Sequence, residues 1–409
     1  MNTHSPLFSI VIPTRNRVNL LQHALRSALR QEFDDYEIVV SDNHSSDKTE
    51  QVVRDLAAGT VTYARTPRSV DMADSWEFGL RQTRGRYVTY LSDDDAIHPT
   101  LLAKLARAIE KEKVDIIAWP FGGIYYHNSW PDECERNVLR FVNPQRQTLI
   151  VESQSIIDEL SNCRFTHRLP RFLNSCTSRE VIAEITHKLG RVFWPPCPDY
   201  TSGVAQLAFR SRLAYLDDLV LLFGVAKESI GVSASSHGEA AQTFVQELRN
   251  NNVPILEHVP LKILSPMNYG LDSFLLMYKK LADMLPELRF SWSAYYRTVR
   301  NEIVSRNIPG QSSNTEIDEF WRALRQERWN LRWRVRSEIT YQNLRKRIPL
   351  GSFRELIGVV HGVSWTTARG EEYGFKDIFE CSQALDAISS SARDGSEREL
   401  EVGSSTCAS

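Results

Sequence analysis

Three consecutive carboxylates, Asp93, Asp94 and Asp95, directly follow a short apolar run, Tyr87–Leu91, and Ser92. Adjacent negative charges repel one another unless something compensates them. Mg²⁺ and Mn²⁺ prefer oxygen ligands, and proteins usually hold them with one or two carboxylates plus substrate phosphates. The cluster therefore predicts a divalent-cation site that screens charge on a departing diphosphate. The alternative is a solvated acidic turn before a helix that begins near Pro99.

A second polar cluster follows another short apolar run. Glu37–Val40 has the composition of a strand, and the polar segment Ser41–Asp47 comes directly after it. In open sheets of parallel strands, ligands bind at the carboxyl ends of the strands. The two clusters therefore predict a ligand site at one edge of a sheet.

The segments around these clusters alternate between strand and helix patterns. Apolar residues recur at helical spacing between the strands, most clearly over Met72–Leu80. This alternation predicts an α/β fold with a mostly parallel, Rossmann-like sheet and flanking helices. The predicted strands are Phe8–Ile12, Glu37–Val40, Val61–Ala64, Tyr87–Leu91 and Ile116–Trp119.

The pattern also predicts how the chain is divided. Residues 1–230 are predicted to form one domain with two halves, 1–120 and 121–230. Residues 231–388 are predicted to be a mainly helical C-terminal region. Residues 389–409 are small and polar, which predicts a tail without fixed structure.

Bulk properties exclude several classes of protein. The net charge of −2 over 409 residues gives no whole-molecule field that would attract nucleic acid. The six cysteines include no C-x-x-C pair, which argues against a zinc site and fits a reducing cytoplasm. The sequence contains no run of about eighteen apolar residues, so no transmembrane helix is predicted. The sequence therefore predicts a cytoplasmic protein, and it carries no sign of an oligomeric state.

Four motifs, in order, resemble those of family 2 glycosyltransferases. They are FSIVIPTRNR (Phe8–Arg17), EIVVSDNHSSDKT (Glu37–Thr49), WEFGL (Trp76–Leu80) and GRYVTYLSDDD (Gly85–Asp95). The resemblance is clear from residue 7 to about 120 and fainter to about 225. It implies a GT-A type transferase that moves a sugar from a nucleoside-diphosphate sugar, with UDP favoured, to a saccharide or lipid-linked acceptor. It further implies inversion at the sugar and a role in cell-surface polysaccharide synthesis.

The resemblance also implies a nucleotide-binding half over residues 1–120, an acceptor half over residues 121–230, and roles for single residues. Nucleotide binding falls to Pro13, Thr14, Arg15 and Asp42, although Asp42 could instead form an Asx-type turn. The acidic cluster resembles the family's D-x-D motif. Asp93 and Asp94 would bind the donor, and Asp94 and Asp95 would bind Mn²⁺ or Mg²⁺. Two registers stay open, because Ser92 stands where the family pattern Asp-x-Asp-Asp begins.

The catalytic base must take a proton from the acceptor hydroxyl. In similar enzymes this base is the Asp of a Glu-Asp pair, roughly 100 residues past the metal motif and before a helix. Asp199 lies at that distance, although Pro198 replaces the usual Glu. The alternative is that Asp199 caps the following helix. Asp217 and Asp218 are rival acids, but their position before an apolar run is typical of turn residues.

Phe320–Arg347 is rich in Arg and Trp and has one apolar face. Such a helix could contact an anionic membrane at the inner face, or it could pack on its own domain. The apolar face is formed by Phe320, Leu324, Leu331, Val335 and Ile339.

Local roles are predicted for other residues in the motifs. Asp71 is expected to cap a helix and Trp76 to lie in the core, while His44 and His98 are expected in surface-turn and capping roles.

Two rival functions stay open. A nucleotidyltransferase should carry a Gly-rich phosphate loop after its first strand, and Pro13–Arg17 is not such a loop. A non-catalytic nucleotide- or carbohydrate-binding protein remains compatible with Pro198.

Overall fold

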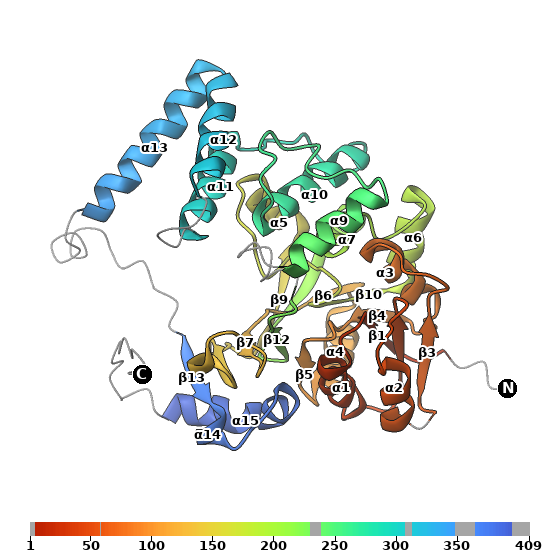
Figure 1. Ribbon diagram of the computed structural model, residues 1–409. Helices are drawn as coiled ribbons and strands as arrows, with labels where there is room; N and C mark the ends of the chain where they lie inside the picture. Colours follow the sequence, from red (N-terminus) through yellow and green to blue (C-terminus); the bar gives the residue numbers. More distant parts are fainter. Residues whose placement is uncertain (1–4, 58, 230–238, 307–312, 348–364, 395–409) are drawn as a thin grey trace.

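The computed structural model describes the chain except residues 1–4, 58, 230–238, 307–312, 348–364 and 395–409. An eight-stranded sheet lies at its centre, in the order β3-β2-β1-β4-β10-β6-β11-β9 (Figure 1). The bounds are β1 (Phe8–Thr14), β2 (Tyr36–Asp42), β3 (Val61–Arg65), β4 (Tyr87–Tyr90), β6 (Ile116–Ala118), β9 (Gln147–Glu152), β10 (Ser175–Ser178) and β11 (Arg212–Asp217).

The strand pairing confirms the predicted fold class. β1 is parallel to both β2 and β4, and β2 is parallel to β3. β10 runs antiparallel between β4 and β6, and β9 is antiparallel to β11 at the edge. The five predicted strands are β1, β2, β3, β4 and β6, with bounds shifted by at most two residues at either end.

Helices cover both faces of this sheet. On one face, apolar side chains of β1 and β2 pack against α1 (Val18–Leu29), α2 (Thr49–Ala57) and α4 (Leu101–Glu112). On the other, Val11, Val39 and Tyr90 meet α3 (Met72–Arg81), α5 (Ser153–Ser161), α6 (Arg179–Leu189) and α7 (Pro198–Phe209). Alternate side chains of a strand point to opposite faces, so each strand contributes to both cores.

A smaller, five-stranded sheet lies beside the first, in the order β13-β8-β7-β12-β5. Its strands are β5 (Ala96–Ile97), β7 (Gly123–Tyr126), β8 (Val138–Phe141), β12 (Leu221–Val225) and β13 (Thr366–Arg369). A short 3₁₀ turn, Glu133–Glu135, lies between β7 and β8. The apolar run Leu219–Ala226 therefore contains a strand, but that strand belongs to the second sheet.

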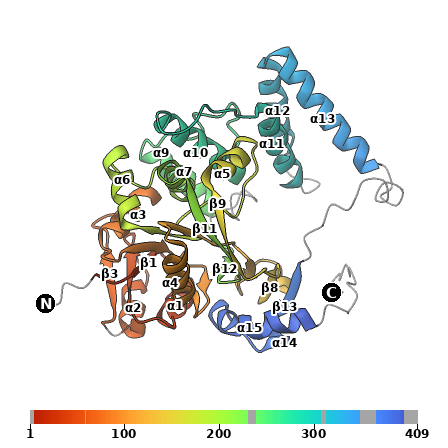
Figure 2. The same ribbon diagram turned by 180° about the vertical axis from the view of Figure 1, so that it is seen from behind.

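Five helices form a separate apolar cluster toward the C-terminal side. They are α9 (Glu239–Asn250), α10 (Pro266–Lys280), α11 (Trp292–Arg306), α12 (Ser313–Gln326) and α13 (Trp329–Arg347). α13 lies at the periphery of the molecule in both views (Figures 1 and 2). None of the helices within the described ranges combines the length and apolarity that a bilayer-spanning segment needs.

The C-terminal segment returns to the N-terminal half, which the sequence did not predict. β13 pairs with β8, and α14 (Gly370–Tyr373) and α15 (Ile378–Asp394) follow it. α15 packs on the second sheet and contacts α1 (Figure 2). The predicted tail begins inside a helix, because Ser389 is a buried residue of α15. Residues 395–409 lie outside the described ranges.

Candidate active site

The acidic cluster forms a buried turn between β4 and β5, and each of its carboxylates has different partners. Asp93 accepts hydrogen bonds from Thr14 Oγ1 at 2.8 Å and from Arg17 Nη1 at 3.0 Å. The guanidinium of Arg17 also lies 3.9 Å from Asp94 and donates to the carbonyl of Glu228. Burial raises the pKa of Asp93, and Arg17 opposes that rise. Asp93 is thus matched by a cation of the protein itself.

Asp94 has both carboxylate oxygens engaged by hydroxyl groups. Oδ1 accepts from Ser92 Oγ at 2.5 Å, and Oδ2 accepts from Ser229 Oγ at 2.6 Å. Its backbone carbonyl lies 2.7 Å from Nε2 of His127. The turn therefore depends on Ser229, which lies 135 positions further along the chain.

Asp95 differs from its neighbours because one of its oxygens has no partner. Oδ1 accepts from the backbone N–H of Gly224 at 2.8 Å, whereas Oδ2 is buried without a hydrogen bond. Burial, followed by the charge of Asp94, raises the pKa of Asp95 well above its usual range. A Cβ at position 224 would lie 1.6 Å from the carbonyl of Asp94, so only glycine permits this approach of β12.

The unpartnered oxygen of Asp95 fits an oxygen-preferring cation. Within the described ranges, no three His, Cys, Asp or Glu side chains converge into a ready metal site. Such a cation would therefore need further ligands from phosphates or water, as Mg²⁺ and Mn²⁺ commonly do. Among the three carboxylates, Asp95 is the one with an oxygen that is free to coordinate a cation.

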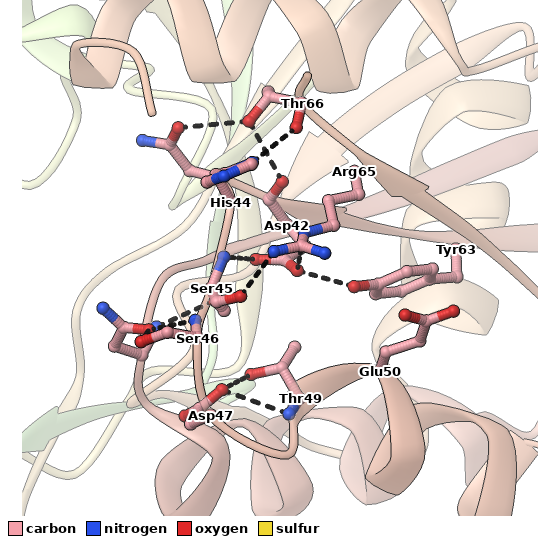
Figure 3. A network of polar contacts seen from close by, with 12 residues as sticks. Asp42, His44, Ser45, Ser46, Asp47, Thr49, Glu50, Tyr63, Arg65 and Thr66 are labelled. Carbon is pink, nitrogen blue, oxygen red and sulfur yellow. Dashed lines mark hydrogen bonds and ion pairs between the residues drawn. The ribbon is translucent and has the colours of Figure 1, made fainter. Parts of the chain in front are cut away.

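Asp42 lies at the end of β2 with its carboxylate enclosed (Figure 3). Oδ1 accepts from the Ser45 N–H at 2.9 Å, which is the Asx-type turn of the alternative interpretation. Oδ2 accepts from the Tyr63 hydroxyl at 2.6 Å, and Arg65 Nε lies 3.6 Å from it. The carboxylate of Asp42 is thus already engaged by groups of the protein itself.

The remaining predicted nucleotide residues lie at the end of β1. Pro13 and Thr14 pair in register with Ser41 and Asp42, and Thr14 connects this turn to Asp93. The structure thus brings the first, second and fourth motifs to one edge of the sheet. Arg15 instead forms a 2.8 Å ion pair with Glu247 of α9.

Asp199 lies in the first turn of α7, but it is not the N-cap. Cys197 occupies the cap position and makes no side-chain capping bond. Asp199 Oδ2 lies 3.8 Å from Arg171 Nη1. Burial raises the pKa of Asp199, and the charge of Arg171 opposes the rise. The charge of Arg171 also opposes the rise in the pKa of Asp95, so one cation acts on both carboxyls.

Arg171 and Tyr200, the residue after Asp199, line a cavity of about 90 Å³. The other lining residues are Phe165, Thr166, His167 and Leu169. Aromatic residues, an imidazole and a guanidinium therefore surround this space.

The local roles predicted for other polar residues are confirmed. Asp71 caps α3 by accepting from the Asp74 N–H at 3.0 Å, and Trp76 is buried and stacks on Tyr90. His44 is an exposed turn residue with positive φ, and His98 bonds to Thr100 before α4. Asp218 pairs with Lys104 at 2.7 Å in the turn after β11. None of these side chains contacts the acidic cluster through a hydrogen bond or ion pair that the described residues show.

Sequence reasoning missed several residues of the site. Arg17 ends the first motif and could have been found there, because a cation near three carboxylates is expected on electrostatic grounds. The others, Arg171, Gly224 and Ser229, lie far from the motifs in the sequence and carried no local signal.

The comparisons agree with the motifs. Residues 9–168 match the family model of Glycosyl transferase family 2. An uncharacterized glycosyltransferase of Rickettsia typhi is 31% identical over 119 residues, which are 29% of this chain and 37% of the relative. The GalNAc(5)-diNAcBac-PP-undecaprenol beta-1,3-glucosyltransferase of Campylobacter jejuni is 36% identical over 108 residues, 24% of this chain and 33% of that protein.

A solved structure of S. aureus TarS 1–349 with UDP has a TM-score of 0.45 and 16% identity, covering 89% of this chain and 97% of that one. The chain spans about a third of the length of the curated relatives it matches. The similarity to family 2 glycosyltransferases is thus established for residues 9–168.

Proposed function

We propose that this protein transfers a sugar from a nucleoside-diphosphate sugar, with UDP favoured, to an acceptor hydroxyl. The proposal rests mainly on the meeting of the family's motifs at one edge of the sheet. There the Thr14 hydroxyl donates a hydrogen bond to Asp93, which lies 79 positions further along the chain. Asp42 and Asp93–Asp95 all lie at the carboxyl ends of neighbouring strands, the usual ligand position in such sheets.

In the proposed reaction, Asp199 is the general base. Its carboxylate takes the proton of the acceptor hydroxyl as that oxygen forms a bond to C1 of the sugar. The C1–O bond to the diphosphate breaks, and its electron pair leaves with the diphosphate. One base and no nucleophile on the protein give inversion at C1.

A divalent cation, Mn²⁺ or Mg²⁺, would screen the negative charge of the diphosphate. Asp95 would hold it through its unpartnered oxygen, with Asp94 as the rival ligand. Arg17 and Thr14 engage Asp93, so Asp93 is proposed to shape the turn and the donor site and not to coordinate the cation.

The proposed acceptor is a saccharide or a lipid-linked saccharide used in cell-surface polysaccharide synthesis. The Campylobacter jejuni relative is named for an undecaprenol-diphosphate-linked acceptor, which supports this direction for the shared 108 residues. The proposed location is the cytoplasm, with contact at the inner face of the membrane.

The membrane contact rests on one side of α13. The predicted apolar face is not available for it, because Phe320, Leu324, Val335 and Ile339 are buried in the helical cluster. The segment Phe320–Arg347 is also not one helix, because α12 ends at Gln326 and α13 begins at Trp329. On the opposite side of α13, Trp329 is 74% exposed and Trp333 is 70% exposed.

The charges around these tryptophans favour an anionic surface. Arg334 and Arg336 are exposed beside them, and Glu338, the acid of this stretch, is paired with Arg297 and Arg334. Tryptophan at the headgroup level and arginine near anionic lipid both favour peripheral binding.

Replacing Trp329 and Trp333 together by Ala should reduce binding of the full chain to phosphatidylglycerol-containing vesicles by about tenfold. The measurement is co-sedimentation, with phosphatidylcholine vesicles as the uncharged comparison. Trp365→Ala is the matched control, because Trp365 is 46% exposed on another part of the molecule. Absence of wild-type binding to anionic vesicles would contradict the membrane contact.

Release of the nucleotide from a panel of nucleotide-sugars, with Mn²⁺ present and water as acceptor, tests the proposed function. A transferase should release UDP slowly from its own donor and more slowly from the others. A nucleotidyltransferase would instead consume pyrophosphate, and a binding protein would retain intact donor. Either of these last results would contradict the proposal.

A further inference from the structure

Arg171 lies in the segment before β10, and its charge acts on both acids on which the proposed function depends. Its Nη1 lies 3.8 Å from Asp199 Oδ2, and its charge also favours the ionised form of Asp95. The Arg171 and Asp199 side chains are 18% and 19% exposed, so their interaction is only weakly screened by solvent.

Two aromatic rings hold the guanidinium in place. Its central carbon lies 4.3 Å from the centroid of Phe121 and 5.1 Å from that of Tyr200. Each ring is itself fixed by an edge-on neighbour, Phe223 at 5.6 Å and Phe165 at 5.2 Å. A cation near aromatic faces is attracted by the ring quadrupoles, most strongly where water is excluded.

The hydrogen-bonding capacity of Arg171 is far from filled. Nη1 donates to the Tyr200 hydroxyl at 3.2 Å, and Nε is buried without any hydrogen bond. Arginines with a purely structural role usually bind carboxylates through two parallel hydrogen bonds. Arg171 makes no such pair of hydrogen bonds to Asp199, but its charge lies close to that carboxylate.

The backbone around Arg171 is also fixed. The N–H of Arg171 donates to Asn174 Oδ1 at 3.1 Å. The amide of Asn174 donates to the carbonyls of Trp119 and His167, both at 2.9 Å. The position of the guanidinium is therefore set from the backbone as well as from the rings.

We propose that Arg171 is a positioning residue for Asp199, whose carboxylate it keeps ionised and oriented for the acceptor hydroxyl. This inference rests on the proposed function, in which Asp199 is the base. The ionisable groups that face Asp199 are Arg171, from the segment before β10, and Cys197 and Tyr200, beside it on α7. Arg171 is the cation among them.

The physical reason is the balance of two effects on one carboxyl. Burial raises the pKa of Asp199, and the carboxyl cannot act as a base while it is protonated. The charge of Arg171 lowers that pKa. Loss of the charge should therefore move the acidic limb of the rate profile to higher pH.

The first test is the pH dependence of UDP release from UDP-sugar donors with Mn²⁺. We expect kcat/KM of Arg171→Met to be lower by about tenfold at pH 6 and within about threefold of wild type at pH 8.5. Arg171→Lys keeps the charge and should keep the wild-type limb. Arg168→Gln is the matched control, since Arg168 is exposed and lies over Tyr215, away from Asp199.

The second test is independent of catalysis. A buried carboxyl whose folded-state pKa is raised gives stability at low pH that is lost as the pH rises. Arg171→Met should raise that pKa further. It should therefore lower the melting temperature more at pH 8 than at pH 5. The pH-dependent part of this difference should become smaller when Asp199 is also replaced by Asn, and the part that remains belongs to Asp95, on which the charge of Arg171 also acts.

These results separate the inference from the proposed function. If the wild type releases nucleotide from no donor, the proposed function fails, and the melting temperatures still test the pairing. A uniform loss of activity at every pH, with no coupling to Asp199→Asn, would make Arg171 a packing residue only and overturn the inference.

Discussion

Replacing Asp199 by Asn should lower the rate of sugar transfer by about 10²–10⁴-fold and leave donor affinity unchanged. Asn has nearly the same shape but cannot accept the proton of the acceptor hydroxyl. The donor phosphates are proposed to bind at the acidic turn, to which Asp199 does not belong, so donor binding should not depend on this carboxylate. Initial rates with a saturating donor measure the first effect, and calorimetry with UDP measures the second.

Asp218→Asn is the matched control for this experiment. Asp218 was a rival acid in the sequence, but it is paired with Lys104 in the turn after β11. Its replacement should leave the rate within about threefold of wild type, because the proposed reaction uses the carboxylate of Asp199 and not that of Asp218, which is paired with Lys104. Unchanged turnover in Asp199→Asn would exclude Asp199 as the base.

Replacing Asp95 by Asn should weaken UDP binding in the presence of Mn²⁺ by about tenfold or more. The change removes the carboxylate oxygen that is free to coordinate the cation, and losing a ligand of a metal site weakens both metal and donor affinity. Chelation of the metal should weaken wild-type donor binding to a similar extent. Chelation should not weaken donor binding further in Asp95→Asn, because both changes remove the same metal interaction. Calorimetric titrations with and without Mn²⁺ measure each of them.

Asp94→Asn separates the two registers of the acidic motif. Both of its oxygens accept hydrogen bonds from serine hydroxyls, so the structure favours a smaller effect at this position. A larger loss in Asp94→Asn than in Asp95→Asn would assign the metal to Asp94. Equal donor affinity with and without Mn²⁺ in the wild type would remove the metal role of the whole cluster.

Metal-free Asp95→Asn should also be at least as stable as the wild type. An unpartnered buried carboxylate destabilises the fold, and neutralising it removes that cost. Higher stability with lower donor affinity would identify Asp95 as a residue kept for function.

The strands and helices up to Trp119 were predictable because their signals are local. Each strand is a short apolar run with a polar end, and each helix has one apolar stripe, so periodicity alone located β1 to β4 and α1 to α4. The same logic placed Asp42 and Asp93–Asp95 at one sheet edge. It could not distinguish the three carboxylates, because their difference lies in their partners.

Those partners come from distant parts of the chain. Gly224, Ser229 and Arg171 reach the site through the second sheet, the segment after it and the turn before β10. Pairings of this kind leave no periodic trace in the sequence. Asp199 was only partly predictable: the sequence predicted the helix that follows it, but not that Cys197 would occupy the cap position of that helix.

The pairing of β13 with β8 has a consequence for the order in which the protein is made. β12, which carries Gly224 beside Asp95, belongs to the sheet that β13 completes at its far edge. Until Thr366–Arg369 leave the ribosome, the edge of β8 is unpaired and the apolar side chains beneath α15 are uncovered. The motifs are synthesised first, but the sheet that supports their acidic turn is completed late in translation. Expression of residues 1–230 alone should therefore give an aggregation-prone fragment.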